Sequence, residues 1–364
     1  MGQGPLTGVR VVEIAGIGPG PFCGLLLADL GADVVRVDRP GGGLTLVPWE
    51  RDPVNRNKRS VVADLTHPEG VEAVLALVER ADILFEGFRP GVAERLGIGP
   101  EDCWRRRPQL VYGRITGWGQ DGPLSRAAGH DVSYLAPTGA LDALGPAGGP
   151  PAIPLNLIGD LGGGALYLAV GVLAALHEAR ASGQGQIVDA AIVDGAAHLM
   201  TMLYGFRANG VWSDERGSNL IDGGAPHYGV YETADGRYMA VGALEPQFFT
   251  ELVERLGLDE PASSRTDRGA WPGLRQRIAE RMRTRTQAEW TEIFAGSDAC
   301  AAPVLSMGDA PSHRHLAARG TFVESFGMVQ PAPAPRFSRT PGAVRTAPPR
   351  PGTTPLAAIL DEWV

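Results

Sequence analysis

The segment that decides the fold is residues 9–39, which read VRVVEIAGIGPGPFCGLLLADLGADVVRVDR. A short β-branched strand at 9–14 leads through a Gly/Pro turn into an apolar helix at 22–30. Gly31 ends this helix, and a second β-branched strand follows at 34–37. The segment therefore predicts a β-α-β unit with two parallel strands.

The same alternation continues along the chain. Thr66 is placed to cap a helix whose apolar residues recur at helical spacing, and a strand follows at 83–85. A long apolar helix near 163–179 and a strand at 186–192 extend the pattern. Alternating strands and helices predict an α/β fold with a parallel, helix-covered, Rossmann-like sheet.

A change of pattern at 229–243, where two short strands flank a turn, predicts a hairpin and with it a second domain. Eight prolines between 331 and 355 favour an extended arm, which either returns to the large domain or wraps a partner subunit. The predicted parts are a large domain at 1–200, a linker at 201–224, a small α+β domain at 225–310, a linker at 311–330, and at 331–364 the arm with a terminal helix returning to the large domain.

Composition excludes several kinds of chemistry. The 33 basic and 41 acidic residues give a net charge of −8, which argues against a nucleic-acid partner. Lys58 is the only lysine, and its Asn57-Lys58-Arg59 context fits neither a pyridoxal-phosphate site nor a Walker loop. The three cysteines form no Cys-x-x-Cys pair, so we expect no metal.

Recognisable targeting signals are also missing. The N-terminus has no basic region followed by an apolar run, and the longest apolar run, 165–176, has 12 residues, too few to span a bilayer. We therefore expect a cytoplasmic protein with no membrane partner.

A glycine loop follows the first strand, but it does not match a dinucleotide-binding fingerprint. Counting from Gly16 or Gly18, the third glycine is replaced by Pro21 or Cys23. Arginines that follow predicted strands, such as Arg39 and those in 89–95, meet at one rim of a parallel sheet and suit phosphate oxygens. A solvated face with ion pairs explains them equally well.

Motifs spread over nearly the whole chain carry a family resemblance. They are LTGVRVVE at 6–13, LGADVVRVDRP at 30–40, FRPG at 88–91, GHD at 129–131, NLIGD at 156–160, DGGAP at 222–226, EPQF at 245–248 and PRFSRT at 335–340. By these motifs the chain resembles the class III CoA-transferase family, and most closely its alpha-methylacyl-CoA racemase branch.

The resemblance implies a CoA thioester, a 2-methyl-branched acyl-CoA, as substrate rather than as an added cofactor. It also implies an interlocked homodimer, in which two ring-like chains pass through each other. The positions that match the family's CoA-binding residues are Ile17, Arg39, Ala63, Arg89 and Arg95, with Lys58 and Arg59 as weaker matches.

The family's racemases move a proton through a planar enolate, and this reaction needs an acid and a base on opposite faces of one carbon. The resemblance assigns these roles to His130 and Asp160, with the histidine serving the S substrate and the aspartate the R substrate. Glu245 matches the carboxylate that partners the histidine, and we include Asp131, beside His130, in the catalytic set.

Each residue also has an ordinary structural explanation. Asp131 is placed to cap the helix that begins near Val132, with His130 in a loop, and Asp160 is placed to cap the long apolar helix. A helix N-terminus lowers a carboxyl pKa, whereas a proton donor near neutral pH needs a raised one. For Asp160 to act as a proton donor, burial beside an apolar acyl chain would have to raise its pKa more than the helix N-terminus lowers it. Glu245, as a lone glutamate before Pro246, would most often be solvated.

Two other functions stay open. In a transferase of the same family, the aspartate at position 160 is a nucleophile that forms an acyl anhydride and moves CoA between carboxylic acids. A catalytically idle CoA-binding protein is the third interpretation. The histidine at position 130 favours the racemase, since the transferases usually have another residue there.

Overall fold

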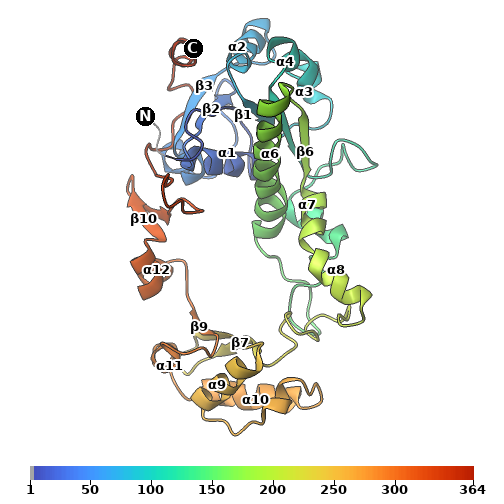
Figure 1. Cartoon of the computed structure of the whole chain (residues 1–364), viewed down its shortest axis with the longest axis vertical. Helices are drawn as coiled ribbons and strands as arrows, with labels where there is room; N and C mark the ends of the chain where they lie inside the picture. The colour runs from blue at the N-terminus through green and yellow to red at the C-terminus, as the bar shows by residue number, and fades with distance from the viewer. Residues whose placement is uncertain (1–3) are drawn as a thin grey trace. The chain divides into compact units, whose positions relative to one another are not determined.

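The computed structural model describes residues 4–364 and divides them into two compact units. The large unit contains the described residues up to Thr138 together with Pro154–Thr201 and Ala318–Val364. The small unit contains Gly139–Ile153 and Met202–Ala317 (Figure 1). The large unit is thus built from three separate stretches of chain.

A six-stranded sheet organises the large unit, and all of its strands are parallel. The strand order is β3-β2-β1-β4-β5-β6, which is the order of a doubly wound nucleotide-binding sheet. The predicted α/β fold is therefore confirmed. The strands are β1 (Arg10–Ile14), β2 (Asp33–Asp38), β3 (Lys58–Val62), β4 (Ile83–Glu86), β5 (Val111–Thr116) and β6 (Ile187–Ala191).

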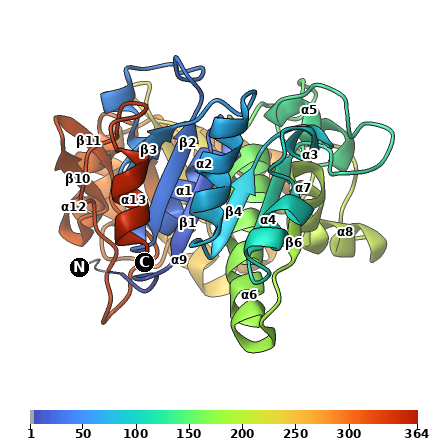
Figure 2. The ribbon, with the colours of Figure 1, turned by 90° about the horizontal axis from the view of Figure 1, so that it is seen from above.

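Helices cover both faces of this sheet because side chains alternate along each strand. Val11 packs on the face covered by α1 (Pro19–Asp29) and α6 (Leu166–Ser182). Val12 packs on the opposite face. That face is covered by α2 (Pro68–Val78), α4 (Pro100–Arg106) and α13 (Leu356–Glu362) (Figure 2).

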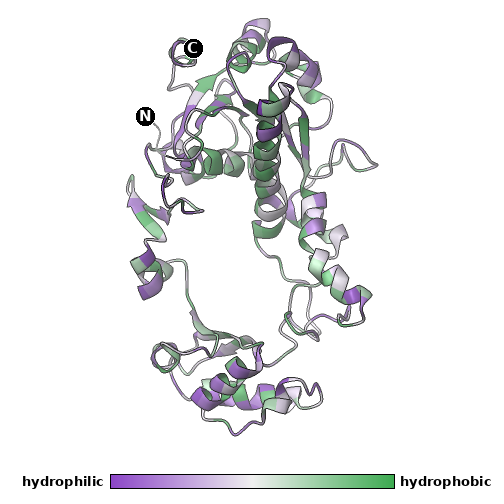
Figure 3. Cartoon of the chain, viewed as in Figure 1, coloured by the Kyte–Doolittle hydropathy of each residue, from purple (hydrophilic) through white to green (hydrophobic). Residues whose placement is uncertain are grey.

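The helical run Leu157–Ser182 is long and apolar enough to cross a membrane by length and composition. Its inner face instead belongs to the core of the large unit, where Leu168 and Val172 are fully buried. We interpret it as a core helix, and its apolar character is visible in Figure 3. The run begins with a π-helical segment, η4 (Leu157–Ala165), so the helix starts earlier than the predicted residue 163.

The proline-rich arm lies against the large unit. Asn57, with a φ of 64°, holds it: the Asn57 Nδ2 atom donates to Ala343 O at 2.7 Å, and Asn57 Oδ1 accepts the Arg345 N–H at 2.6 Å. Farther along, the Thr354 N–H donates to Ser60 O at 2.9 Å, on the outer side of edge strand β3. Helix α13 then places Trp363 in the core.

The small unit combines an antiparallel sheet with helices. The predicted hairpin is β7 (Tyr228–Glu232) with β8 (Tyr238–Gly242), and β9 (Ala301–Val304) pairs with β8. A capping box formed by Thr286 and Glu289 begins α11. The helices are α8 (Thr201–Ala208), which starts in the large unit, α9 (Pro246–Leu256), α10 (Trp271–Met282) and α11 (Gln287–Phe294).

The remaining elements lie outside the six-stranded sheet. All of them belong to the large unit except α12, whose first residues belong to the small unit. They are α3 (Val92–Arg95), α5 (Asp131–Leu135), α7 (Ile192–Leu199), α12 (Arg314–Arg319) and the hairpin β10 (Phe322–Ser325) with β11 (Met328–Pro331).

The structure adds one strand that the sequence patterns did not predict, and it corrects one predicted helix cap. The segment that opens with Lys58 is a sheet strand, which hydrophobic patterning missed because only its second half is apolar. Helix α2 begins at Pro68 with His67 at the N-cap, whereas Thr66 uses its hydroxyl to bond the Asp64 carboxylate at 2.6 Å.

Candidate active site

The carboxyl ends of the six parallel strands bring several predicted site residues to one edge of the sheet. Ile17 follows β1, Arg39 follows β2, Ala63 follows β3, and Arg89 follows β4. Arg95 ends the short helix α3 in the same crossover as Arg89. Ala63 is buried, and the other four side chains are exposed at this edge.

Lys58 and Arg59 do not join this group, because they open strand β3 and so lie at its amino end. The Lys58 ammonium is fully buried and forms an ion pair with Glu13 Oε2 at 2.8 Å. Arg59 pairs with Asp33 and with Glu362. The structure therefore gives Lys58 an internal electrostatic role and no surface for a phosphate.

His130 lies in the loop that connects β5 to helix α5. Its backbone is extended, with φ −137° and ψ 171°, and it occupies the N-cap position of the helix. The Ser133 hydroxyl donates to His130 O at 2.6 Å, and the His130 N–H donates to Ser133 Oγ at 2.9 Å. These bonds fix the backbone and leave the imidazole exposed.

Asp131 is the first residue of α5 and not its cap, which corrects the structural explanation offered above. Its side chain is 7% exposed and reaches the π-helical segment η4, where Asp131 Oδ1 accepts the Asp160 N–H at 2.6 Å. Gly159 permits this approach, since a Cβ there would lie 2.3 Å from Asp131 Oδ1. Asp131 thus links the two elements that carry His130 and Asp160.

Asp160 also differs from its predicted capping position. It is the fourth residue of η4, a rare helix type found frequently at functional sites, and its side chain is half-buried. Burial first, and then the negative charge of Asp131, raise the pKa of its carboxyl group. Asn156 and His130 act in the opposite direction but more weakly. The hydrogen bond from the Asp160 N–H to Asp131 joins the loop that carries His130 to the segment that carries Asp160.

The glycine loop after β1 packs against the same carboxylate. Gly18 has a φ of 69°, and a Cβ added there would lie 3.2 Å from Asp160 Oδ2. The loop that misses the dinucleotide fingerprint therefore allows a close approach to the Asp160 carboxylate. Composition alone gave no reason to connect Gly18 with residue 160, which is distant in sequence.

Tyr134 is a site residue that sequence reasoning missed. Its ring packs edge-on against Trp118, with 5.0 Å between the centroids, and its hydroxyl donates to Gly129 O. Burial and the charge of Asp160 raise the pKa of the Tyr134 phenol. The signal available in the sequence was its position one helical turn after the GHD motif.

Glu245 belongs to the small unit, where it is the exposed N-cap residue of α9. The Phe249 N–H donates to Glu245 O at 2.9 Å, so the backbone begins the helix while the carboxylate faces solvent. Its pairing with His130 stays a prediction.

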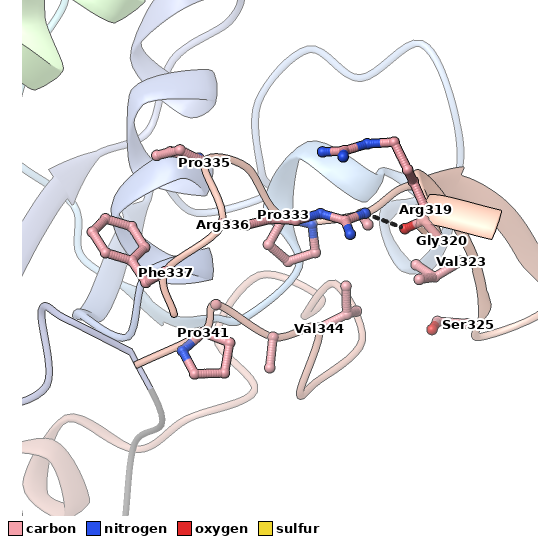
Figure 4. Close-up of a pocket in the computed structure, with 13 residues that line it drawn as sticks. Arg319, Gly320, Val323, Ser325, Pro333, Pro335, Arg336, Phe337, Pro341 and Val344 are labelled. Carbon is pink, nitrogen blue, oxygen red and sulfur yellow. Dashed lines mark hydrogen bonds between the residues drawn. The ribbon is translucent and has the colours of Figure 1, made fainter. Parts of the chain in front are cut away.

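Among residues 4–364, no three His, Cys, Asp or Glu side chains gather as metal ligands. A cavity of about 460 Å³ lies between the β10–β11 hairpin and the arm, where the Arg336 guanidinium donates to Gly320 O at 3.0 Å (Figure 4). None of the predicted site residues lines this cavity.

Comparison with known proteins defines the class to which this fold and site belong. The model of CoA-transferase family III matches residues 6–354, and the chain belongs to this family. An alpha-methylacyl-CoA racemase from Mus musculus is 45% identical over 338 residues, which cover 92% of this chain and 87% of that protein. The predicted resemblance is confirmed.

Two further relatives show the range of the family. The beta subunit of a succinyl-CoA–L-malate CoA-transferase from Chloroflexus aurantiacus is 33% identical over 374 residues, which cover 96% of this chain and 91% of that one. A solved CAIB/BAIF family protein from Brucella suis superposes with a TM-score of 0.84 at 27% identity, covering 100% of both chains.

Proposed function

We propose that the protein is a racemase of 2-methylacyl-CoA thioesters that requires no added cofactor. The observation that carries this proposal is the hydrogen bond from the Asp160 N–H to Asp131. This bond joins the loop that carries the exposed His130 to a half-buried aspartate whose pKa is raised. The 45% identity to a mouse racemase over most of the chain supports it.

The reaction assigns one proton transfer to each side chain. For an S substrate, the His130 imidazole removes the α-proton, and protonated Asp160 returns a proton to the other face of the enolate. For an R substrate the roles reverse. The raised pKa supports this assignment, because it keeps a proton on Asp160 closer to neutral pH than an exposed aspartate would. Glu245 is proposed to orient the His130 ring.

The carboxyl edge of the sheet is proposed to bind the nucleotide end of the thioester. Arg39, Arg89 and Arg95 are exposed there, and guanidinium groups form charge-assisted hydrogen bonds with phosphate oxygens. Ile17 and Ala63 give the adenine apolar contacts. We further propose an interlocked homodimer, which size-exclusion chromatography with light scattering tests: a monomer at micromolar concentration would contradict it.

The alternative is CoA transfer, with Asp160 as nucleophile. The 33% identity to the Chloroflexus transferase subunit favours it. His130 disfavours it, because the imidazole has a role in racemisation and none in the anhydride mechanism.

One experiment separates these functions. The protein is incubated in D₂O with a single epimer of a 2-methylacyl-CoA, with and without an acceptor acid, while α-deuterium, configuration and CoA transfer are followed. Epimerisation with exchange supports the racemase, and acceptor-dependent movement of CoA supports the transferase. His130→Ala is expected to abolish inversion with CoA affinity largely retained. Full activity in this variant would remove His130 from the mechanism.

A further inference from the structure

Arg114, near the end of strand β5, is the centre of a polar cluster beside the site. Its side chain is only 9% exposed. Its guanidinium group bonds the Glu94 carboxylate, donates to Gln120 Oε1 at 2.8 Å, and lies 3.8 Å from Glu86 Oε1. Its central carbon also lies 5.4 Å from the centroid of the Tyr112 ring, within the range of a cation–π contact.

The two acids mark the ends of one segment. Glu86 is the last residue of β4, and Glu94 lies in α3, so residues 86–94 form a loop with both ends on one arginine. Glu86 also shapes the loop from inside, because its Oε2 accepts the Phe88 N–H at 2.5 Å. Gly91, with a φ of 79°, makes the turn into α3.

This loop carries the cations proposed to bind the substrate. Arg89 lies between the two anchored ends, and Arg95 directly follows Glu94. Both are exposed at the carboxyl edge, whereas Arg114 is covered. The third contact, Gln120, connects the cluster to the loop after β5, where the Gln120 N–H donates to Asp189 Oδ2 at 3.2 Å.

We propose that Arg114 is a positioning residue for the nucleotide end of the acyl-CoA: it holds both ends of the 86–94 loop and thereby fixes Arg89 and Arg95 for the phosphates. This inference rests on the proposed function for the identity of the ligand. In this proposal Arg114 does not touch the substrate. It affects only the binding of the part of the ligand that carries phosphate.

The test compares two substrates that differ in that part. Arg114→Met keeps much of the volume and removes the charge. It is expected to raise KM for a 2-methylacyl-CoA roughly tenfold, the order of one lost charge-assisted contact, with kcat unchanged. The corresponding pantetheine thioester, which carries no nucleotide and no phosphate, is expected to keep its KM.

Arg106→Met is the matched control. Arg106 also bonds two glutamates, Glu72 and Glu79, but it joins α2 to α4 on the face of the sheet. This variant is expected to leave the KM of both substrates unchanged. If Arg114→Met misfolds, Glu94→Gln releases one end of the loop and is expected to shift the same KM ratio by a smaller factor.

Three outcomes would overturn the proposal: equal KM changes for both thioesters, a fall in kcat alone, or no change in either substrate. Calorimetric binding of CoA and of pantetheine provides the same comparison without turnover. If Arg114→Met weakens the binding of CoA but not of pantetheine, and the unchanged protein does not racemise, the proposed function is refuted and the positioning role stands.

Discussion

The Asp131 carboxylate holds the backbone N–H of Asp160 at 2.6 Å while its charge raises the pKa of the Asp160 side chain. One buried group therefore positions Asp160 and adds to the effect of burial on its pKa. The two effects can be separated, since an amide oxygen accepts the same hydrogen bond without a charge.

Asp131→Asn is expected to lower the pKa of Asp160 with its backbone still held. Asp160 must be ionised to act as the base for the R substrate, so the acid limb of kcat/KM in that direction is expected to move to lower pH. Full pH–rate profiles in both directions measure this. An unmoved acid limb, or one moved to higher pH, would contradict the electrostatic role of Asp131.

Glu86 is predicted to make stability depend on pH. Burial raises its pKa from 4.5 to about 7, against the smaller effects of the Phe88 N–H and Arg114. The folded state thus binds the proton more tightly than the unfolded state. The stabilisation is complete below pH 4.5 and is lost as the pH rises through about 7.

Glu86→Gln removes this titration. Relative to the unchanged protein, the free energy of unfolding of the variant is expected to rise by on the order of 3 kcal/mol between pH 4.5 and pH 8. Urea unfolding at four pH values in that range checks the slope. A constant difference between the two proteins would mean that Glu86 does not titrate there.

Breaking the buried Lys58–Glu13 ion pair is expected to be costly, because both side chains are fully covered. Lys58→Met leaves the Glu13 charge unpaired and is expected to destabilise the fold by roughly 3 to 5 kcal/mol. Urea unfolding at pH 7 measures the loss. The double variant Lys58→Met/Glu13→Gln is the control and is expected to regain most of it. A double variant no more stable than the single one would show that the charge is not the cause.

Asn57 is expected to decide whether the arm stays on the large unit. Asn57→Ala removes the bonds to Ala343 and Arg345 and places an alanine at a φ of 64°, for an expected loss of roughly 2 to 4 kcal/mol. Limited proteolysis within 332–350 reports release of the arm.

Asn57→Gly separates the causes, since glycine tolerates this backbone conformation but lacks the side-chain bonds. It is expected to release the arm with about 1 kcal/mol less loss than alanine. An arm that resists protease equally in both variants would show that other contacts hold it.

Much of the fold was predictable because it follows from local patterns. The two β-branched strands and the apolar helix of residues 9–39 are β1, β2 and α1. Strand β3 was missed because its first half is polar. A lysine is normally expected at the surface, whereas Lys58 is buried and paired with Glu13 in the fold. Only tertiary structure brings those charges together.

Sequence motifs identified the main residues of the candidate site but not the contacts between them. The GHD motif and the resemblance pointed to His130 and Asp160, and in the structure Asp131, the neighbour of His130, bonds the Asp160 N–H. Sequence spacing did not reveal the π-helical form of η4, the bond from Asp160 to Asp131, or the contribution of Tyr134. These depend on contacts between segments that lie about thirty residues or more apart, or on the geometry of one helical turn.

The bond from the Gly352 N–H to Ser60 Oγ joins residues 292 positions apart, and it covers the open side of β3. During synthesis on the ribosome, the edge strand therefore emerges long before the segment that shields it, and the whole small unit is made in between. Throughout that interval the nascent sheet exposes unpaired backbone groups, which are a template for aggregation with other chains. Changes in residues 351–363 are thus expected to increase chaperone dependence and aggregation into inclusion bodies more than changes in the active site.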